Sequence, residues 1–494
     1  MKFEEYRAQD ALGLARLIAG QQVSAAELLE CAIARAEAVN PKLNAIVRPL
    51  YALGRERARQ SLNGPLAGVP FLLKDLMADL AGEPTSGGSR FFADYVPEQD
   101  SELVARYKKA GLVIFGKTNT PELGLTPFTE PELFGPAHNP WNLDYTPGGS
   151  SGGSGAAIAA GIVPAANGGD GGGSIRIPAA CCGLVGLKPT RGRIPTGPLR
   201  GDFWYGSATE HVLTRSVRDT AALLDATEGA DAGSPYFTAP PAQPFLKQLK
   251  QETPKLRIAF SAKPMLGLKM DPACIDGLQR SVQLLQDLGH ELEEDAPPVD
   301  RESFLLAFAQ QIAGETAAEY RAACQVLGKR FDPRQVEPFT MAQIRVGRAL
   351  SAEALGVARR ILALATRQIG QFFEKYDVLL TPTLGMRPFK IGALQPQGLD
   401  AFKLQLINKL PLGTLGKRPT EMLTLAEKIF EWIPNTPVFN VTGQPSISLP
   451  LHQSEEGLPI GMMFTARFGD DATLLKLSAQ LEQAQPWFAR VPEL

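Results

Sequence analysis

The pattern of apolar and polar positions predicts a chain that alternates between helices with one apolar face and short buried strands. Two helices are predicted over residues 10–40, and the second begins at Ser24, where Glu27 completes a capping box. Apolar residues then recur on one face of this helix. Because proline disfavours helical backbone in the residue before it, the helix is expected to end at Asn40-Pro41.

Short apolar runs separated by glycine-rich turns follow between residues 64 and 190. The runs 69–73 and 112–115 predict buried strands, and a helix is expected to begin near Ser101. Buried strands that alternate with helices indicate an α/β protein in which helices cover a central sheet.

The second half of the chain is richer in helical patterns. Residues 302–375 are almost continuously helical in composition, and the stretch of about 300–430 reads as a helical insertion or as a small second domain. The remaining elements predicted here are helices over 212–228 and about 272–288, strands over 256–260 and 377–382, and a strand, turn and helix in the tail after residue 440.

Composition narrows the function further. The 494 residues are 44% hydrophobic, enough for a large core, and 50 basic against 52 acidic residues leave no basic excess for a nucleic-acid partner. The acidic start does not resemble a signal peptide, and no apolar run approaches the length of a membrane span. Five cysteines without a CxxC pair favour reduced thiols, so a cytoplasmic protein without disulfides or zinc is expected.

Two glycine- and serine-rich clusters carry the candidate chemistry. They cover residues 148–155 and 168–174 and bracket an apolar helical stretch. Glycines allow close approach of the backbone, and several N–H groups aimed at one point stabilise an anion such as the oxyanion of acyl transfer. A flexible linker is the plainer interpretation, but the clusters lie between apolar runs. A phosphate-binding loop is disfavoured because neither cluster matches GxxxxGK[ST] or GxGxxG.

A nucleophile elbow is the sharper alternative, since residues 148–152 fit GxSxG. That motif needs a preceding strand and a histidine later in the chain. Pro147 stands directly before the motif. None of the later histidines, at positions 211, 290 and 452, can be justified as the base, and the chain lacks the HExxH spacing of a helical zinc site. A histidine-dependent α/β-hydrolase esterase is kept as an alternative function.

Lysine is the known substitute for histidine as the base of a serine hydrolase. Lys74 ends an apolar run, so its ammonium is expected to be partly desolvated, which lowers its pKa from the usual value of about 10.4. Taken alone, a lysine at the end of a strand more often extends toward solvent. Lys74 becomes a candidate base only in combination with the serine clusters.

Taken together, these segments resemble the amidase signature family. Ser150 and Ser174 are 24 positions apart (174 − 150), which is the spacing between relay serine and nucleophile in that family. The resemblance extends over nearly the whole chain. Its motifs here are GVPFLLKDL, GKTNTPEL, PGGSSGGSGAA, GGDGGGSIRIPAACCGLVGLKPT, DVLLTPT and FNVTGQPSISLP.

The resemblance implies a Ser-Ser-Lys triad. Ser174 would be the nucleophile and Lys74 the base. Ser150 would relay the proton between them and would follow a cis peptide bond, Gly149–Ser150. The N–H group of Ser174 and those of three glycines would form the oxyanion hole, and three further residues would support the site without transferring protons. The glycines are Gly171, Gly172 and Gly173, and the supporting residues are Ser151, Asp170 and Arg176.

The implied fold is a large mixed central sheet covered by helices on both faces, with a helical insertion over the cleft. One amidase domain would span residues 1–494, with a catalytic core of about 64–225 and the insertion at about 300–430. The implied function is hydrolysis of a small carboxamide (linear, cyclic or aryl, with carbamates included) without metal or organic cofactor. The expected partner is this small-molecule substrate, with no nucleic acid and no membrane, and a homodimer is left open.

Within the family, the motifs are most similar to the branch of 6-aminohexanoate cyclic dimer hydrolases, which act on nylon oligomers. Leu125 stands where that branch can carry a polar residue in contact with the substrate, which argues against an identical substrate. Two alternatives share this signature: an amidotransferase subunit that releases ammonia from glutamine, and a catalytically inactive binding protein. The sequence does not decide whether four aromatic residues line an acyl pocket or pack in the core: Phe203, Trp204, Tyr205 and Trp432.

Overall fold

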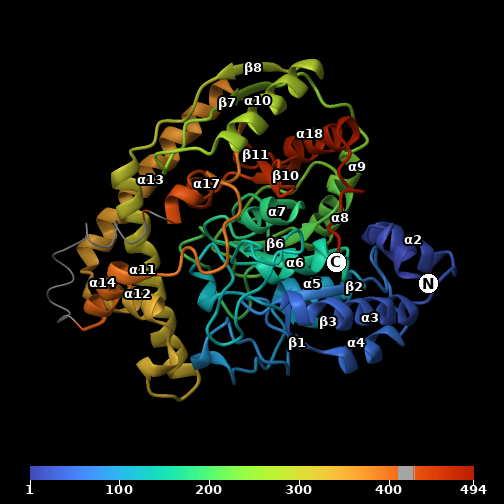
Figure 1. Ribbon diagram of the computed structural model, residues 1–494, viewed down its shortest axis with the longest axis horizontal. Helices are drawn as coiled ribbons and strands as arrows, with labels where there is room; N and C mark the ends of the chain where they lie inside the picture. Colours follow the sequence, from blue (N-terminus) through green and yellow to red (C-terminus); the bar gives the residue numbers. More distant parts are fainter. Residues whose placement is uncertain (410–426, 428) are drawn as a thin grey trace.

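A mixed sheet of 11 strands organises the protein, whose computed structural model describes residues 1–409, 427 and 429–494 (Figure 1). The strands are β1 (Ile46–Pro49), β2 (Pro70–Lys74), β3 (Val113–Thr118), β4 (Ala165–Asp170), β5 (Val185–Lys188), β6 (Thr209–Thr214), β7 (Arg257–Phe260), β8 (Glu291–Glu294), β9 (Val378–Pro382), β10 (Ser446–Gln453) and β11 (Pro459–Ala466). Their order is β1-β3-β2-β4-β6-β5-β10-β11-β9-β7-β8. Pairs are parallel around β2 and at the β9-β7-β8 edge and antiparallel between β4 and β9, so the predicted large mixed sheet is confirmed.

Helices cover both faces of this sheet. They are α1 (Phe3–Arg7), α2 (Ala11–Ala19), α3 (Ala25–Leu43), α4 (Tyr51–Ala58), α5 (Glu102–Lys109), α6 (Gly152–Ala159), α7 (Arg176–Cys182), α8 (Val217–Thr227), α9 (Phe245–Gln248), α10 (Pro272–Asp287), α11 (Arg301–Val326), α12 (Pro338–Ala349), α13 (Ala352–Lys375), α14 (Gly398–Lys409), α17 (Thr436–Thr442) and α18 (Asp471–Ala484), with short 3₁₀ turns η1 (Arg90–Phe92), η2 (Glu122–Gly124) and η3 (Pro333–Gln335). Met462 and Met463 are neighbours on β11 and therefore point to opposite faces. Arg176 of α7 contacts the sulfur of Met463 at 3.4 Å, whereas a Cβ on Gly277 of α10 would lie 3.0 Å from Cε of Met462.

The N-terminal helices form largely as the sequence predicts. Ser24 caps α3, with its hydroxyl accepting from the Glu27 N–H at 3.2 Å and the Glu27 carboxylate accepting from the Ser24 N–H at 2.8 Å. The predicted end at Asn40-Pro41 is wrong, because α3 continues through the proline to Leu43. Proline in the last turn removes only one N–H group, and the helix ends where Asn44 adopts a left-handed φ of 47°.

The predicted helix over 212–228 begins too early. Residues 209–214 form β6, a central strand that pairs with β4 on one side and β5 on the other. The helix α8 begins only after Ser216, whose hydroxyl accepts from the Asp219 N–H at 3.3 Å. Pairing on both sides of β6 therefore overrides the local helical pattern at its end.

The predicted helical insertion forms in its first part. Helix α11 packs against both α12 and α13, and these helices stand with α14 on the left of Figure 1, away from α2, α3 and α4 on the right. However, β9 follows α13 directly and belongs to the central sheet, so the stretch 300–430 is not a continuous insertion. Residues 410–426 and 428 of that predicted stretch lie outside the described residues.

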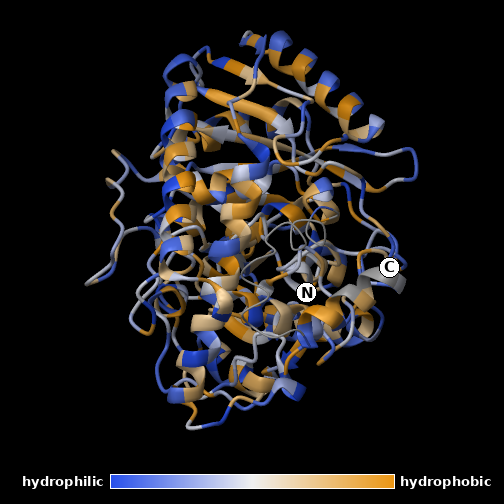
Figure 2. Ribbon diagram, turned by 90° about the vertical axis from the view of Figure 1, so that its left-hand side faces the viewer, coloured by the Kyte–Doolittle hydropathy of each residue, from blue (hydrophilic) through white to orange (hydrophobic). Residues whose placement is uncertain are grey.

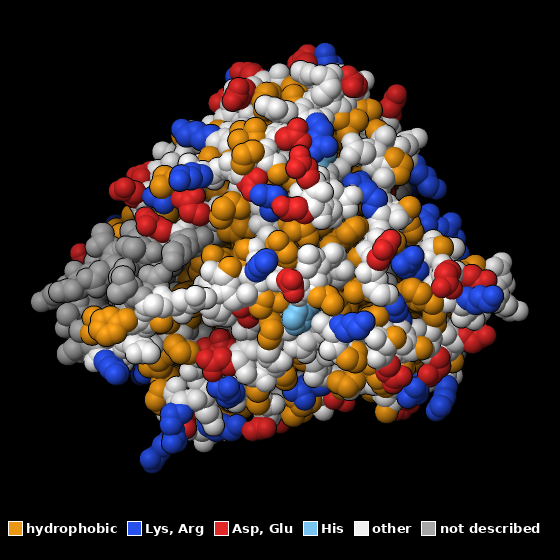
Figure 3. All heavy atoms as spheres, in the orientation of Figure 1, with side chains coloured by type: hydrophobic (Ala, Val, Ile, Leu, Met, Phe, Trp, Pro, Cys, Tyr) orange, Lys and Arg blue, Asp and Glu red, His pale blue; other side chains and the backbone are white. Residues whose placement is uncertain are grey.

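The core lies between the sheet and the helices that cover it. Figure 2 shows helices with a hydrophobic and a hydrophilic side, as expected for helices packed on a sheet. On the face shown in Figure 3, acidic and basic side chains are interspersed, in keeping with 52 acidic and 50 basic residues. Among the described residues, no helix combines the length and the apolar character needed to cross a bilayer.

Candidate active site

The candidate base lies at the end of a strand that is buried along its whole length. β2 is flanked by β3 and β4, and the side chain of its last residue, Lys74, is 1% exposed. Nζ of Lys74 lies 2.6 Å from Oγ of Ser150 and 3.5 Å from the carbonyl oxygen of Gly169. Burial, opposed by the nearby carboxyl groups of Glu210 and Asp170, lowers the pKa of Lys74 to about 7. A large neutral fraction is therefore present near neutral pH.

Ser150 is held in the first glycine- and serine-rich cluster. The Gly149–Ser150 peptide bond is cis, as predicted. A Cβ on Gly149 would lie 2.7 Å from backbone atoms of Phe128, so this position requires glycine. Gly124, at the end of η2, packs as closely on the other side, since a Cβ there would lie 2.9 Å from Oγ of Ser150. The hydroxyl is thus held between the η2 turn and the lysine.

Ser174 lies in the turn that joins β4 to α7. It is 7% exposed and lines the same cavity of about 460 Å³ as Lys74 and Ser150. The three predicted site residues, which are far apart in sequence, are therefore brought together. One prediction needs correction, because the N–H group of Gly173 donates to Oδ1 of Asp170 at 2.7 Å and is not available to an oxyanion. The carboxylate of Asp170 is buried and therefore accepts hydrogen bonds from the nearest N–H groups.

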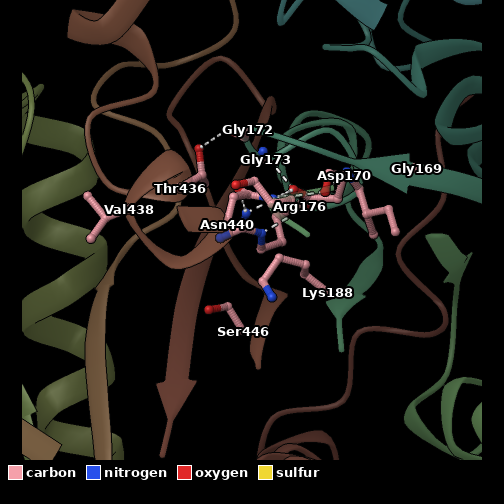
Figure 4. A network of polar contacts seen from close by, with 12 residues as sticks. Gly169, Asp170, Gly172, Gly173, Arg176, Lys188, Thr436, Val438, Asn440 and Ser446 are labelled. Atoms are coloured by element: carbon pink, nitrogen blue, oxygen red, sulfur yellow. Dashed lines mark hydrogen bonds and ion pairs between the residues drawn. The ribbon is translucent and has the colours of Figure 1, made fainter. Parts of the chain in front are cut away.

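A buried ion pair supports this turn (Figure 4). Asp170 and Arg176 are fully buried and make two hydrogen bonds, each of 2.9 Å. Burial alone would raise the pKa of Asp170, but the Arg176 guanidinium and the amide of Asn440 hold it well below its usual range. Ser151 ties the turn to β4, with its Oγ 3.2 Å from both the nitrogen and the carbonyl oxygen of Gly169. The predicted supporting residues thus fix the backbone around Ser174.

Sequence reasoning missed the part of this network that comes from α17. Asn440 donates to the carbonyl and to Oδ1 of Asp170, each at 2.8 Å, and accepts from Arg176 at 2.6 Å. Thr436 donates to the carbonyl of Gly172 at 2.8 Å. The sequence feature that could have indicated Asn440 is its position as a polar residue inside the apolar run PVFNV, since a buried polar group needs hydrogen-bond partners. On sequence alone, this segment served only as a sign of family resemblance.

We expect Arg176→Met to lower the free energy of unfolding by about 3–5 kcal/mol, because it leaves the Asp170 carboxylate buried without its cation. Urea denaturation measures this loss. The control is Arg55→Met, which breaks an exposed pair with Glu30 and is expected to change the free energy of unfolding far less. Equal losses in the two variants would contradict a structural role for the buried pair.

The cavity beside the serines is walled mainly by apolar side chains. Among the undecided aromatic residues, Phe203 and Trp204 line it, whereas Trp432 is fully buried and packs on Phe389 with ring centroids 4.5 Å apart. Tyr205 lies under the guanidinium of Arg359 at 3.9 Å. Further apolar lining residues include Leu76, Met77, Phe92, Leu123, Leu125, Leu199, Val326 and Leu327, and charged side chains also line the cavity, at Arg200, Asp202, Glu315 and Glu319.

The histidines of the chain, all within its described part, lie outside the lining of this cavity. His211 is fully buried, and burial lowers its pKa to about 3. His452 lies 2.7 Å from Oγ of Ser281, and His290 lies 3.0 Å from Oε1 of Gln480. The geometry therefore offers no support for a histidine-dependent esterase.

Comparison with known proteins agrees with this geometry. The family model described as Amidase matches residues 27–475. The chain belongs to the amidase family. It is 39% identical over 482 residues to "Putative amidase AmiC" of Mycobacterium tuberculosis (strain ATCC 25618 / H37Rv), covering 97% of this chain and 95% of that one. The predicted class, a hydrolase of amide C–N bonds, is confirmed by this membership.

The amidase family also includes the branch that the motifs suggested. The 6-aminohexanoate-cyclic-dimer hydrolase of Pseudomonas sp. (strain NK87) is 36% identical over 495 residues, covering 98% of this chain and 97% of that one. A solved structure of 6-aminohexanoate cyclic dimer hydrolase matches with a TM-score of 0.90 at 35% identity, covering 99% of both chains. The predicted fold and the predicted similarity to this branch are confirmed.

Proposed function

We propose that this protein hydrolyses a small carboxamide through an acyl-enzyme on Ser174, with Lys74 as base and Ser150 as relay. The observation that carries the proposal is the distance of 2.6 Å between Nζ of Lys74 and Oγ of Ser150, at the wall of a cavity that Ser174 also lines. A buried lysine with a pKa of about 7 supports it, because only the neutral amine can accept a proton.

Acylation begins with two proton transfers in the same direction. Neutral Lys74 takes the hydroxyl proton of Ser150 as Ser150 takes that of Ser174. Oγ of Ser174 then forms a bond to the carbonyl carbon, and the carbonyl oxygen gains the negative charge. The N–H groups of Gly171, Gly172 and Ser174 are the proposed donors to this oxyanion, and one such donor typically contributes about 2.7–4 kcal/mol.

Collapse of the tetrahedral intermediate breaks the C–N bond. The Lys74 ammonium returns its proton through Ser150 to the leaving nitrogen, which otherwise departs poorly as an anion. Water then donates a proton along the same relay and attacks the acyl carbon, which releases the carboxylic acid and restores Ser174. The ion pair of Asp170 and Arg176 holds the turn in place and transfers no proton.

The substrate we propose carries an apolar acyl or amine part. The wall next to Ser150 is the η2 turn, which places Leu123 and Leu125 in the cavity lining, and Trp204 lies against Gly171. An uncharged alkyl or aryl group gains from burial against these side chains. Linear, cyclic and aryl amides, and carbamates, remain within this class.

We expect Leu125→Asn to lower kcat/KM for an apolar anilide by about tenfold, since the near-isosteric amide would be desolvated without a partner. A small polar amide such as acetamide should be affected far less. Steady-state kinetics with both substrates measure the ratio. The control Leu53→Asn changes an exposed leucine on α4, and equal effects of the two variants would contradict the proposed apolar pocket.

The proposed function is tested with the purified chain and a panel of aliphatic, aryl and cyclic amides. Release of acid and amine without ATP, glutamine or a second protein is the expected result. Ammonia release restricted to glutamine would instead favour the amidotransferase subunit. No hydrolysis, together with no labelling of Ser174 by a fluorophosphonate, would favour an inactive binding protein.

We also propose that residues 1–494 fold as one domain in the cytoplasm. One sheet that joins β1 near the N-terminus to β10 and β11 near the C-terminus supports the single domain. Five free cysteines support a reducing compartment. Limited proteolysis that released a stable fragment, or export of the full chain from cells, would contradict these two proposals.

A further inference from the structure

A buried carboxyl group that the mechanism does not use lies beside the candidate base. Glu210 is on β6, is 4% exposed, and stands directly opposite Gly169 of β4 in the antiparallel ladder. Residues opposite each other in such a ladder project to the same face. Because position 169 has no side chain, the space above it is open to the side chains around it.

Lys74 and Glu210 border this space from two sides. A Cβ on Gly169 would lie 3.8 Å from Nζ of Lys74 and 3.9 Å from Cγ of Glu210. Asn167 links the same two residues, because its side-chain oxygen accepts from the backbone N–H of Lys74 at 3.2 Å and its amide donates to Oε1 of Glu210 at 3.4 Å. The two side chains therefore border the same space above Gly169.

We propose that Glu210 is a positioning residue for this reaction: its carboxylate stabilises the ammonium that Lys74 becomes when Ser174 is deprotonated. The inference rests on the proposed function, since it assigns Glu210 a role only through the lysine. The bonds formed and broken stay those of the mechanism above. What Glu210 changes is the proton affinity of the base.

Three other charged groups, Asp170, Arg200 and Asp79, act on one member of the pair through their charge. On β4, Asp170 is paired with Arg176. Arg200, in the loop after β5, makes an ion pair with Glu319 of α11 at 2.6 Å. Asp79, in the loop after β2, is buried and raises the pKa of Glu210 through repulsion.

The titration of the two groups agrees with this placement. Burial raises the pKa of Glu210 and lowers that of Lys74, while each group opposes the shift of the other. The hydroxyl of Tyr107 stays protonated and uncharged, because burial raises its pKa far above the usual range. Glu210 is thus the acidic group with the largest influence on the lysine.

The test is the pH dependence of kcat/KM in Glu210→Gln. Without the carboxylate the ammonium is less stable, so we expect the alkaline rise in activity to move about one pH unit lower, with a reduced plateau because the amine is a weaker base. A merely structural role for Glu210 would lower the rate at every pH without moving the midpoint. An unchanged midpoint in a folded variant would overturn the proposal.

Two further variants keep the test decisive. Glu482→Gln removes another carboxyl group whose pKa burial raises, here to about 7, but on α18, where it accepts from the N–H of Val217 at 3.1 Å. Its midpoint should match that of the unmodified chain. If Glu210→Gln does not fold, Glu210→Asp withdraws the carboxylate by one methylene and should move the midpoint in the same direction by less. Failure of the proposed function is separate, since it would appear as full activity in Lys74→Met.

Discussion

Replacing Ser174 by alanine is expected to lower kcat for amide hydrolysis by about 10⁶-fold, the size of loss typical when the nucleophile of a serine hydrolase is removed. The reason is chemical, because alanine offers no oxygen to form the acyl-enzyme. The backbone of the turn should persist, since Asp170 and Asn440 hold it through bonds that do not involve the Ser174 hydroxyl. KM should therefore change much less than kcat.

Two measurements check this result. Steady-state kinetics give kcat and KM, and mass spectrometry after treatment with a fluorophosphonate shows whether position 174 is modified. His452→Ala is the control, because it removes a histidine that lies against Ser281 and away from the cavity. Its activity should be retained. Substantial activity in Ser174→Ala would contradict Ser174 as the nucleophile. Loss of activity in His452→Ala would instead favour a histidine as the base.

Local sequence patterns predicted the parts of the fold that local physics determines. The capping box at Ser24 and Glu27 and the buried strand that ends at Lys74 follow from spacing and side-chain chemistry within a few residues. The start of α8 was misplaced because β6 is determined by pairing with β4 and β5, which a local window does not contain. The proposed triad residues could be named because the family resemblance, and not the local pattern, relates them to one another.

The rest of the site depends on contacts between distant segments. Asn440 reaches Arg176 across 264 positions, and nothing near either residue in the sequence indicates the other. The partner of the Gly173 N–H was predicted wrongly for a related reason, since the orientation of the Asp170 carboxylate depends on burial between α7 and α17. Glu210 borders the same space as Lys74 because the pairing of β4 with β6 sets Glu210 opposite Gly169.

Replacing Lys74 by methionine is expected to lower kcat by at least about 10³-fold, since it removes the group that both accepts and returns the proton. Methionine fills a buried site without a charge, and Ser150 loses its hydrogen-bond partner at 2.6 Å. The sign of the pH effect follows from the mechanism: the neutral amine is active, so the activity of the unmodified chain rises as pH passes about 7.

The pH profile and a double variant distinguish this role from general damage to the site. Residual activity of Lys74→Met should lose the rise near pH 7, and Lys74→Met combined with Ser174→Ala should be no worse than Ser174→Ala alone, because residues that act as a unit are not additive. Lys117→Met is the matched control: Lys117 is also buried, with a pKa lowered by burial to about 8, but its Nζ contacts Thr85 at 2.6 Å. That variant should keep the rise near pH 7. If the rise survives in Lys74→Met but disappears in Lys117→Met, the base is Lys117 and not Lys74, and the proposed relay through Ser150 is contradicted.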